Sequence, residues 1–197
     1  DERVLRFFRI KSKKKVNLSP WKKITHLVLN TKNKVNIAII GKYVELKDAY
    51  KSLDEALTHG GIANNLKVNL IRIESDFLKP SEIKNKLKGA SGILIPGGFG
   101  KRGTEGKIAA INYARLNKIP FLGICFGMQM AVIEFARNKL NIKKATSSEF
   151  GPSKASVVGL MSEWTKDGKL MKGTDKDLGG TMRLGSYEAR LKKDTKI

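Results

Sequence analysis

The sequence has few of the side chains that form disulfides or bind zinc. It contains one cysteine and two histidines in 197 residues. A single cysteine excludes an internal disulfide, which is typical of a protein from a reducing compartment, so we expect a cytoplasmic location. Three such side chains also fall short of the four ligands of a structural zinc site, and we predict that the chain binds no metal.

Long hydrophobic runs and acidic residues are also scarce. No run of 18 or more apolar residues occurs, so we predict no membrane-spanning helix. Lysine and arginine number 39 against 18 acidic residues, which gives a net charge of +21. Aromatic residues are only 7% of the chain and do not alternate with the basic clusters. We therefore interpret the charge as a lysine-rich solvated surface and expect no specific nucleic-acid partner.

Strand-like and helix-like segments alternate through the middle of the chain. Apolar runs at 35–40, 92–95 and 119–122 and an alternating run at 68–73 predict strands, of which 35–40 is expected to be buried. Segments at 48–59, 81–87, 105–117 and 128–137 predict helices. This alternation is typical of the α/β class, in which an open, mostly parallel sheet has helices on both faces. Ligands of such sheets bind beyond the carboxyl ends of the strands.

The two ends of the chain depart from this alternation. Residues 1–33 hold a basic cluster and a helical segment over 21–28, and they predict an arm that precedes a domain over 34–197. Residues 165–180 are polar and contain glycine, so they predict a loop. Apolar residues alternate over 181–191 and predict an edge strand.

The cysteine lies in the turn Gly123-Ile124-Cys125-Phe126-Gly127, which we call the elbow. A glycine on each side lets the backbone turn sharply between the preceding strand and the following helix. This arrangement presents a nucleophile above the sheet edge, at the positive end of a helix, where the reactive thiolate is favoured. A thiol in this position is typical of acyl transfer through a thioester.

A second turn, Pro96-Gly97-Gly98-Phe99-Gly100, also follows a predicted strand. We call it the glycine-rich turn. Acyl transfer needs hydrogen-bond donors for the oxyanion that develops on the attacked carbonyl. The Phe126 N–H and an N–H of the glycine-rich turn are the candidate donors, because both turns belong at the same edge of the sheet.

Together the two turns resemble those of the class I (triad) glutamine amidotransferases, and more closely those of the glutaminase domain of CTP synthases. The stretches that carry the resemblance are 17–21, 41–46, 48–52, 96–100, 123–129, 148–150 and 177–185. The resemblance implies a flavodoxin-like fold. It also implies that 1–33 is an interdomain linker and 34–197 a glutaminase domain.

The resemblance further implies roles for individual residues. Cys125 would attack the side-chain amide of L-glutamine, form a glutamyl thioester and release ammonia. Glu149 would bind the α-amino group of the substrate, and Phe99 and Arg102 would belong to a lid that responds to GTP. Oxyanion and glutamine binding would fall to Gly98, Phe126, Gly127, Met128 and Gln129.

The same resemblance implies a longer enzyme. In the family, the ammonia converts UTP to CTP in pyrimidine nucleotide biosynthesis, in an amidoligase domain that precedes the glutaminase domain. That enzyme is a homo-oligomer that uses ATP and Mg²⁺ with GTP as activator, whereas we expect no cofactor on this chain itself. The catalytic histidine and glutamate of the family lie in a His-Pro-Glu motif, yet no histidine follows Cys125. We therefore expect the domain to be incomplete at its C-terminus.

Three alternatives stay open on the sequence alone. The chain could be a truncated, catalytically inactive remnant that binds glutamine. It could be another cysteine hydrolase that uses His26 or His59 as its base, although His59 fits a helix end better. It could also bind nucleic acid through its basic surface, which would make binding strongly salt-dependent.

Overall fold

A computed structural model describes residues 2–11, 17–44, 46, 48–160, 163–166, 169–172, 188 and 190–194. The chain divides into two compact units, Asp1–Val158 and Gly159–Ile197. The first unit contains all the helices and strands described below, except one hairpin in the second unit.

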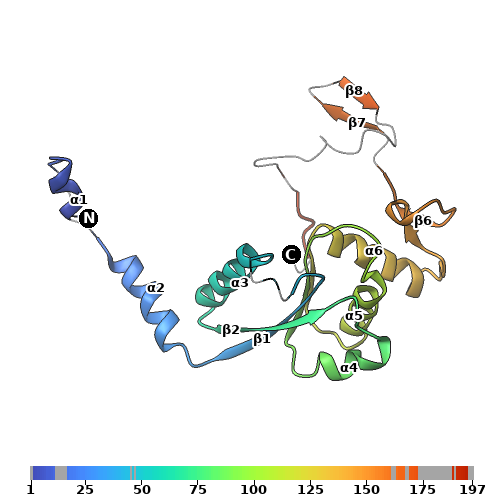
Figure 1. The fold of residues 1–197 in the computed structure, drawn as a ribbon, viewed down its shortest axis with the longest axis horizontal. Helices are drawn as coiled ribbons and strands as arrows, with labels where there is room; N and C mark the ends of the chain where they lie inside the picture. Colours follow the sequence, from blue (N-terminus) through green and yellow to red (C-terminus); the bar gives the residue numbers. More distant parts are fainter. Residues whose placement is uncertain are drawn as a thin grey trace. The chain divides into compact units, whose positions relative to one another are not determined.

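The centre of the first unit is a four-stranded parallel sheet with the order β2-β1-β3-β4 (Figure 1). Its strands are β1 (Lys34–Gly41), β2 (Lys67–Glu74), β3 (Gly92–Ile95) and β4 (Phe121–Gly123). This is the order of the first four strands of a flavodoxin-like sheet. The predicted α/β class with a parallel sheet is confirmed. The strand predicted over 92–95 has those ends, and the strands predicted over 35–40, 68–73 and 119–122 are present with shifted ends.

The direction of the crossovers explains where the helices lie. The sheet grows from β1 to β2 on one side, and then to β3 and β4 on the other. Right-handed crossovers therefore put the first connecting helix on one face and the later ones on the opposite face. Figure 1 shows α3 apart from the group formed by α4, α5 and α6. The helices are α3 (Lys51–Ala63), α4 (Ile83–Lys86), α5 (Thr104–Leu116) and α6 (Phe126–Asn138), with a 3₁₀ turn, η1 (Pro80–Glu82), before α4.

The hydrophobic core lies between the sheet and α5 and α6. Ala38 and Ile40 of β1 are fully buried, as are Ile95 of β3 and Met130 and Ile133 of α6. Because β1 and β3 are covered on both faces, they are apolar without alternation, which is the pattern of central parallel strands. The rigid centre of the sheet thus supports the turns that follow β3 and β4.

Shorter elements flank this body. Two helices precede the sheet, α1 (Glu2–Phe7) and α2 (Ser19–Asn30), and the second contains the helix predicted over 21–28. After α6 come β5 (Thr146–Ser147), the 3₁₀ turn η2 (Ser148–Phe150) and β6 (Ser156–Val158).

The prediction of a loop over 165–180 is wrong at its start. An antiparallel hairpin joins β7 (Glu163–Lys166) to β8 (Lys169–Lys172). An Asp-Gly dipeptide between two short runs is a strong hairpin signal, and the polar composition concealed it. The motif stretch 177–185 and most of the edge strand predicted over 181–191 lie outside the described residues.

Candidate active site

The backbone at Cys125 has the geometry of a nucleophile on a sharp turn. Its φ is 50° and its ψ is −103°, a conformation that residues other than glycine seldom adopt. The residue lies immediately before α6, and its thiol is exposed. Strained backbone at an exposed nucleophile is a common feature of functional sites, because the surrounding structure must hold it in place.

The glycines on either side of the cysteine are needed for close packing. A Cβ at Gly123 would lie 2.5 Å from the carbonyl carbon of Gly127. A Cβ at Gly127 would overlap the carbonyl oxygen of Ile95 at the end of β3. The Ile124 N–H also donates to that Ile95 oxygen, at 2.9 Å. The elbow therefore packs directly against the carboxyl end of β3.

The glycine-rich turn lies beside the cysteine, as the sequence predicted. A Cβ at Gly97 would lie 3.6 Å from the Cβ of Cys125, whereas a Cβ at Gly98 would meet no atom within 4 Å. Gly98, the residue after Gly97, therefore faces space that no described residue fills. The Phe126 N–H donates to no protein acceptor in the described part of the chain. An unpaired N–H beside an exposed thiol is available to a ligand oxygen.

Glu149 joins this site from a distant part of the sequence. Its carboxylate accepts a hydrogen bond from the Gly100 N–H at 2.5 Å. The Ser147 hydroxyl accepts from the Glu149 N–H at 3.2 Å and so caps η2. The ring of Phe150 makes an edge contact with the ring of Phe126, at 6.1 Å between centroids. Three separate motifs of the sequence thus meet at one place.

Two further predicted site residues, Met128 and Gln129, follow the cysteine on α6. The Gln129 N–H donates to the Cys125 carbonyl oxygen at 3.1 Å, and the Met128 side chain is exposed on α6. His26 lies on α2 near Asn30. Within the described residues, no hydrogen bond joins Cys125 to either histidine. The structure therefore lends no support to His26 or His59 as the base of a cysteine hydrolase.

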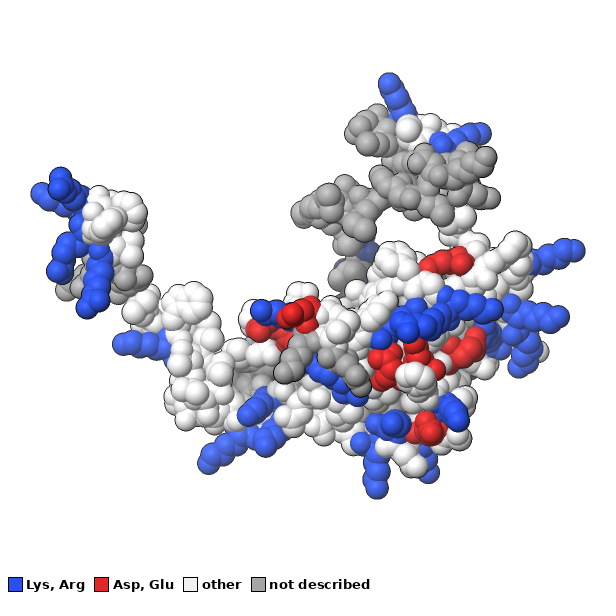
Figure 2. Space-filling model, viewed as in Figure 1, with Lys and Arg blue, Asp and Glu red and all other residues white. Residues whose placement is uncertain are grey.

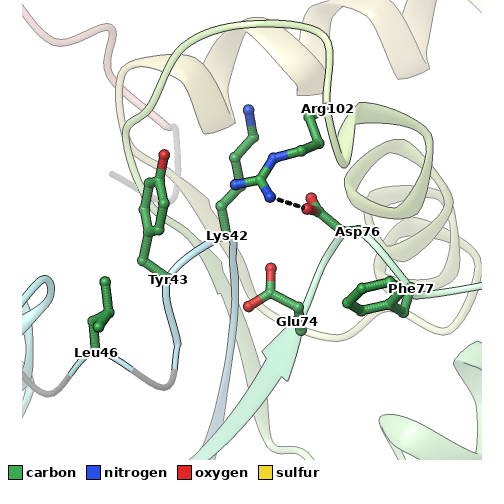
Figure 3. A pocket seen from close by; sticks show the side chains of 7 residues that line it. All are labelled: Lys42, Tyr43, Leu46, Glu74, Asp76, Phe77 and Arg102. Atoms are coloured by element: carbon green, nitrogen blue, oxygen red, sulfur yellow. Dashed lines mark ion pairs between the residues drawn. The ribbon is translucent and has the colours of Figure 1, made fainter.

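Arg102, one of the two candidate lid residues, lies at a neighbouring hollow. Phe99 is 77% exposed, and Arg102 forms an ion pair with Asp76 at 2.8 Å. Figure 3 shows this pair and the Glu74 carboxylate facing the middle of a cavity of about 360 Å³. The cavity is lined by Lys42, Tyr43, Leu46, Glu74, Asp76, Phe77 and Arg102. Cys125 is not part of this wall.

Two lysines that sequence reasoning missed lie against the elbow. The Lys42 ammonium donates to the carbonyl oxygens of Phe99, at 2.5 Å, and Gly100, at 3.3 Å. The Lys107 ammonium lies 4.9 Å from the centre of the Phe126 ring, and Lys107 is only 1% exposed. A signal was available, because Lys107 occurs four residues before Ile111, on the buried stripe of α5.

Among the described residues, no group of three or more histidine, cysteine, aspartate or glutamate side chains could hold a metal ion. No helix in the same residues is long and apolar enough to cross a membrane. On the face in Figure 2, basic side chains are spread over several elements with acidic ones between them.

Comparison with known proteins decides the family. The model for glutamine amidotransferase class-I matches residues 45–197. The chain belongs to the class I glutamine amidotransferase family. It is similar to the CTP synthase of Pelagibacter ubique (strain HTCC1062), with 73% identity over all of this chain and 37% of that protein. It is also 56% identical to the CTP synthase of Rhizobium johnstonii (strain DSM 114642 / LMG 32736 / 3841), over all of this chain and 36% of that protein.

A solved structure of this amidotransferase type agrees. It is the glutaminase domain of Trypanosoma brucei CTPS with bound acivicin, which is 40% identical to this chain with a TM-score of 0.61. The match covers 64% of this chain and 50% of the solved one. The predicted family and fold are therefore confirmed. The chain itself spans little more than a third of the length of the curated relatives it matches.

Proposed function

We propose that this chain carries the nucleophile and the oxyanion hole of a glutaminase. The observation that carries the proposal is the elbow itself, with Cys125 at a φ of 50° next to a Phe126 N–H and a Gly98 that meet no partner among the described residues. The Cys125 thiolate attacks the side-chain amide carbon of glutamine. The carbonyl oxygen takes the negative charge and receives hydrogen bonds from the Phe126 N–H and from the turn at Gly98. The nitrogen of this intermediate takes a proton from solvent, the C–N bond breaks, and ammonia leaves behind a glutamyl thioester. Water then hydrolyses the thioester to glutamate and frees the thiol.

Substrate binding involves the residues around the elbow. Glu149 is a carboxylate next to the glycine-rich turn, and its charge suits the α-amino group of glutamine. Gly127 seats the elbow on β3, whereas Met128 and Gln129 border the cysteine from the first turn of α6. Phe99 and Arg102 form the lid, which the Arg102–Asp76 ion pair holds against the end of β2.

The names of the relatives support a larger role. We infer that the ammonia serves the amination of UTP to CTP, as part of a cytoplasmic CTP synthase in which residues 1–33 link this domain to an amidoligase domain. That assembly uses ATP and Mg²⁺, responds to GTP and forms a homo-oligomer. The similarity to CTP synthases over the full length of this chain supports the inference.

The first test is labelling of Cys125 by acivicin, the compound bound in the Trypanosoma brucei glutaminase domain. We expect the chain to be labelled at Cys125 and glutamine to protect it, whereas Cys125→Ala takes no label. Ammonia release from glutamine should be slower by about 10²–10⁴-fold than in a site with a general base, because within the described residues no hydrogen bond joins Cys125 to a histidine.

Two results would contradict this function. Labelling that glutamine does not slow would mean that the site does not recognise the substrate. Glutamine protection without any ammonia release would favour the inactive glutamine-binding remnant.

A further inference from the structure

Lys107 is a buried cation on which the carboxylates of Asp76 and Glu74 act only through space. It is 1% exposed, and its ammonium has no ion pair or hydrogen bond among the described residues. Its ammonium lies over the face of the Phe126 ring, at 4.9 Å from the centroid. A cation over an aromatic face is attracted by the ring quadrupole, and the attraction is strongest where water is excluded. Burial of an unpaired charge nevertheless destabilises the fold.

A second lysine, Lys42, also lies over the Phe126 ring, and it is hydrogen-bonded to the glycine-rich turn. The Lys42 ammonium lies 5.8 Å from the Phe126 centroid and donates to the carbonyl oxygens of Phe99 and Gly100. Phe126 is therefore connected to both halves of the proposed oxyanion hole. Its own N–H is one donor, and its ring is linked through Lys42 to the turn that bears Gly98.

We propose that Lys107 is a positioning residue, whose buried ammonium holds the Phe126 ring and so sets where the Phe126 N–H points. This inference rests on the proposed glutaminase function. The ring is also in edge contact with Phe150 and is itself 1% exposed, so it is restrained from several directions. A backbone donor must lie about 2.7–3.1 Å from the position that the oxyanion will occupy, and small displacements in an active site are costly.

The surroundings of Lys107 favour a functional reason for its charge. Burial, and to a lesser degree the charge of Lys42, lower the pKa of Lys107 to about 8, although Asp76 and Glu74 act in the opposite direction. Arg102 lowers it further. The fold alone would be better served by an apolar side chain of the same length. A residue that costs stability next to a nucleophile is typical of active sites.

The test uses glutamate γ-semialdehyde, the aldehyde analogue of glutamine. The Cys125 sulfur adds to its carbonyl carbon, the C=O π bond breaks, and the oxygen becomes a thiohemiacetal oxygen in the oxyanion hole, with the thiol proton passing to that oxygen or to solvent. Iodoacetamide alkylates the same thiol without using the hole. We expect Lys107→Met to weaken aldehyde affinity about tenfold relative to the wild-type chain, with an alkylation rate that stays within about twofold.

Two controls separate positioning from loss of structure or charge. Lys84→Met removes the same charge from an exposed site on α4 and should leave aldehyde affinity unchanged. Lys107→Arg keeps a cation that can lie over the ring and should retain more of the affinity than Lys107→Met. Equal aldehyde affinity in the wild type and Lys107→Met, or an equal loss in Lys84→Met, would overturn the proposal.

A different result would contradict the proposed glutaminase function itself. A wild-type chain that reacts with iodoacetamide at Cys125 but shows no saturable aldehyde binding has no oxyanion hole for glutamine. That result would overturn the proposed function and the role of Lys107 together. In contrast, wild-type binding that Lys107→Met leaves intact would overturn the role of Lys107 alone.

Discussion

Two buried charges on neighbouring helices have opposite surroundings. The Glu134 carboxylate on α6 accepts hydrogen bonds from Asn112 at 2.8 Å, from Arg115 at 2.8 Å and from Asn138 at 3.1 Å. The Lys107 ammonium on α5 has an aromatic ring and, within the described chain, no hydrogen-bonded acceptor. Both residues are 1% exposed.

The pKa values follow this difference. Burial by itself would raise the pKa of Glu134, but the hydrogen bonds from Arg115 and Asn112 outweigh it and the pKa is lowered, so the charged form is favoured. Burial also dominates at Lys107, where nothing outweighs it and the charged form is disfavoured. The Glu134 carboxylate therefore joins two helices. The Lys107 ammonium is retained at a cost in stability beside Phe126, the residue that follows the nucleophile.

The largest effect is expected from removal of the satisfied charge. Glu134→Ala should lower the free energy of unfolding by about 3 kcal/mol, because the donors of Arg115, Asn112 and Asn138 lose their common acceptor. Urea denaturation measures this loss. Glu105→Ala is the matched control, since Glu105 is exposed in its pair with Arg137 and should contribute under about 1 kcal/mol. Similar losses in both variants would remove the distinction between buried and surface pairs.

Removal of the unsatisfied charge should act in the opposite direction. Lys107→Met is expected to raise the free energy of unfolding at pH 7 by on the order of 2 kcal/mol, since a lysine pKa of about 8 in the fold compares with about 10.4 in the unfolded chain. Wild-type stability should rise between these two pH values, because the unfolded chain then binds more protons. Lys107→Met should lack this rise.

Urea denaturation at pH 7 and pH 9.5 measures both parts of this prediction. A Lys107→Met chain that is less stable than the wild type at pH 7 would mean that the buried lysine supports the fold after all. The contrast with Glu134 would then disappear.

The smallest effect is expected from a change in the charges around Lys107. Asp76→Asn removes a carboxylate that raises the pKa of Lys107 and releases Arg102 from its ion pair, so the pKa of Lys107 should fall further. Stability should change by less than about 1 kcal/mol, because Arg102 is largely exposed. NMR titration of the lysine ε-methylene groups follows the pKa. Asp54→Asn, which breaks a pair with Arg72 on another face, should not move it.

Much of the fold was accessible from local patterns. The apolar runs of β1 and β3 are continuous because these strands are covered on both faces, so their prediction needed no tertiary information. The hairpin β7–β8 was missed because polar composition was given more weight than the Asp-Gly signal between its strands. Three features that the family resemblance implies remain predictions. They are the catalytic histidine, the amidoligase domain and the cofactors of the larger enzyme.

The sequence by itself determined the elbow and its neighbour across the sheet. Gly123 and Gly127 can each approach a backbone only because they lack a Cβ, and parallel strands bring their carboxyl ends to one edge. Only the tertiary structure decided that Glu149 bonds to Gly100 and that Lys107 lies under Phe126. Such contacts depend on how α5, α6 and η2 pack against the sheet. A periodic pattern tells which face of a helix is buried, but not which side chain it will meet there.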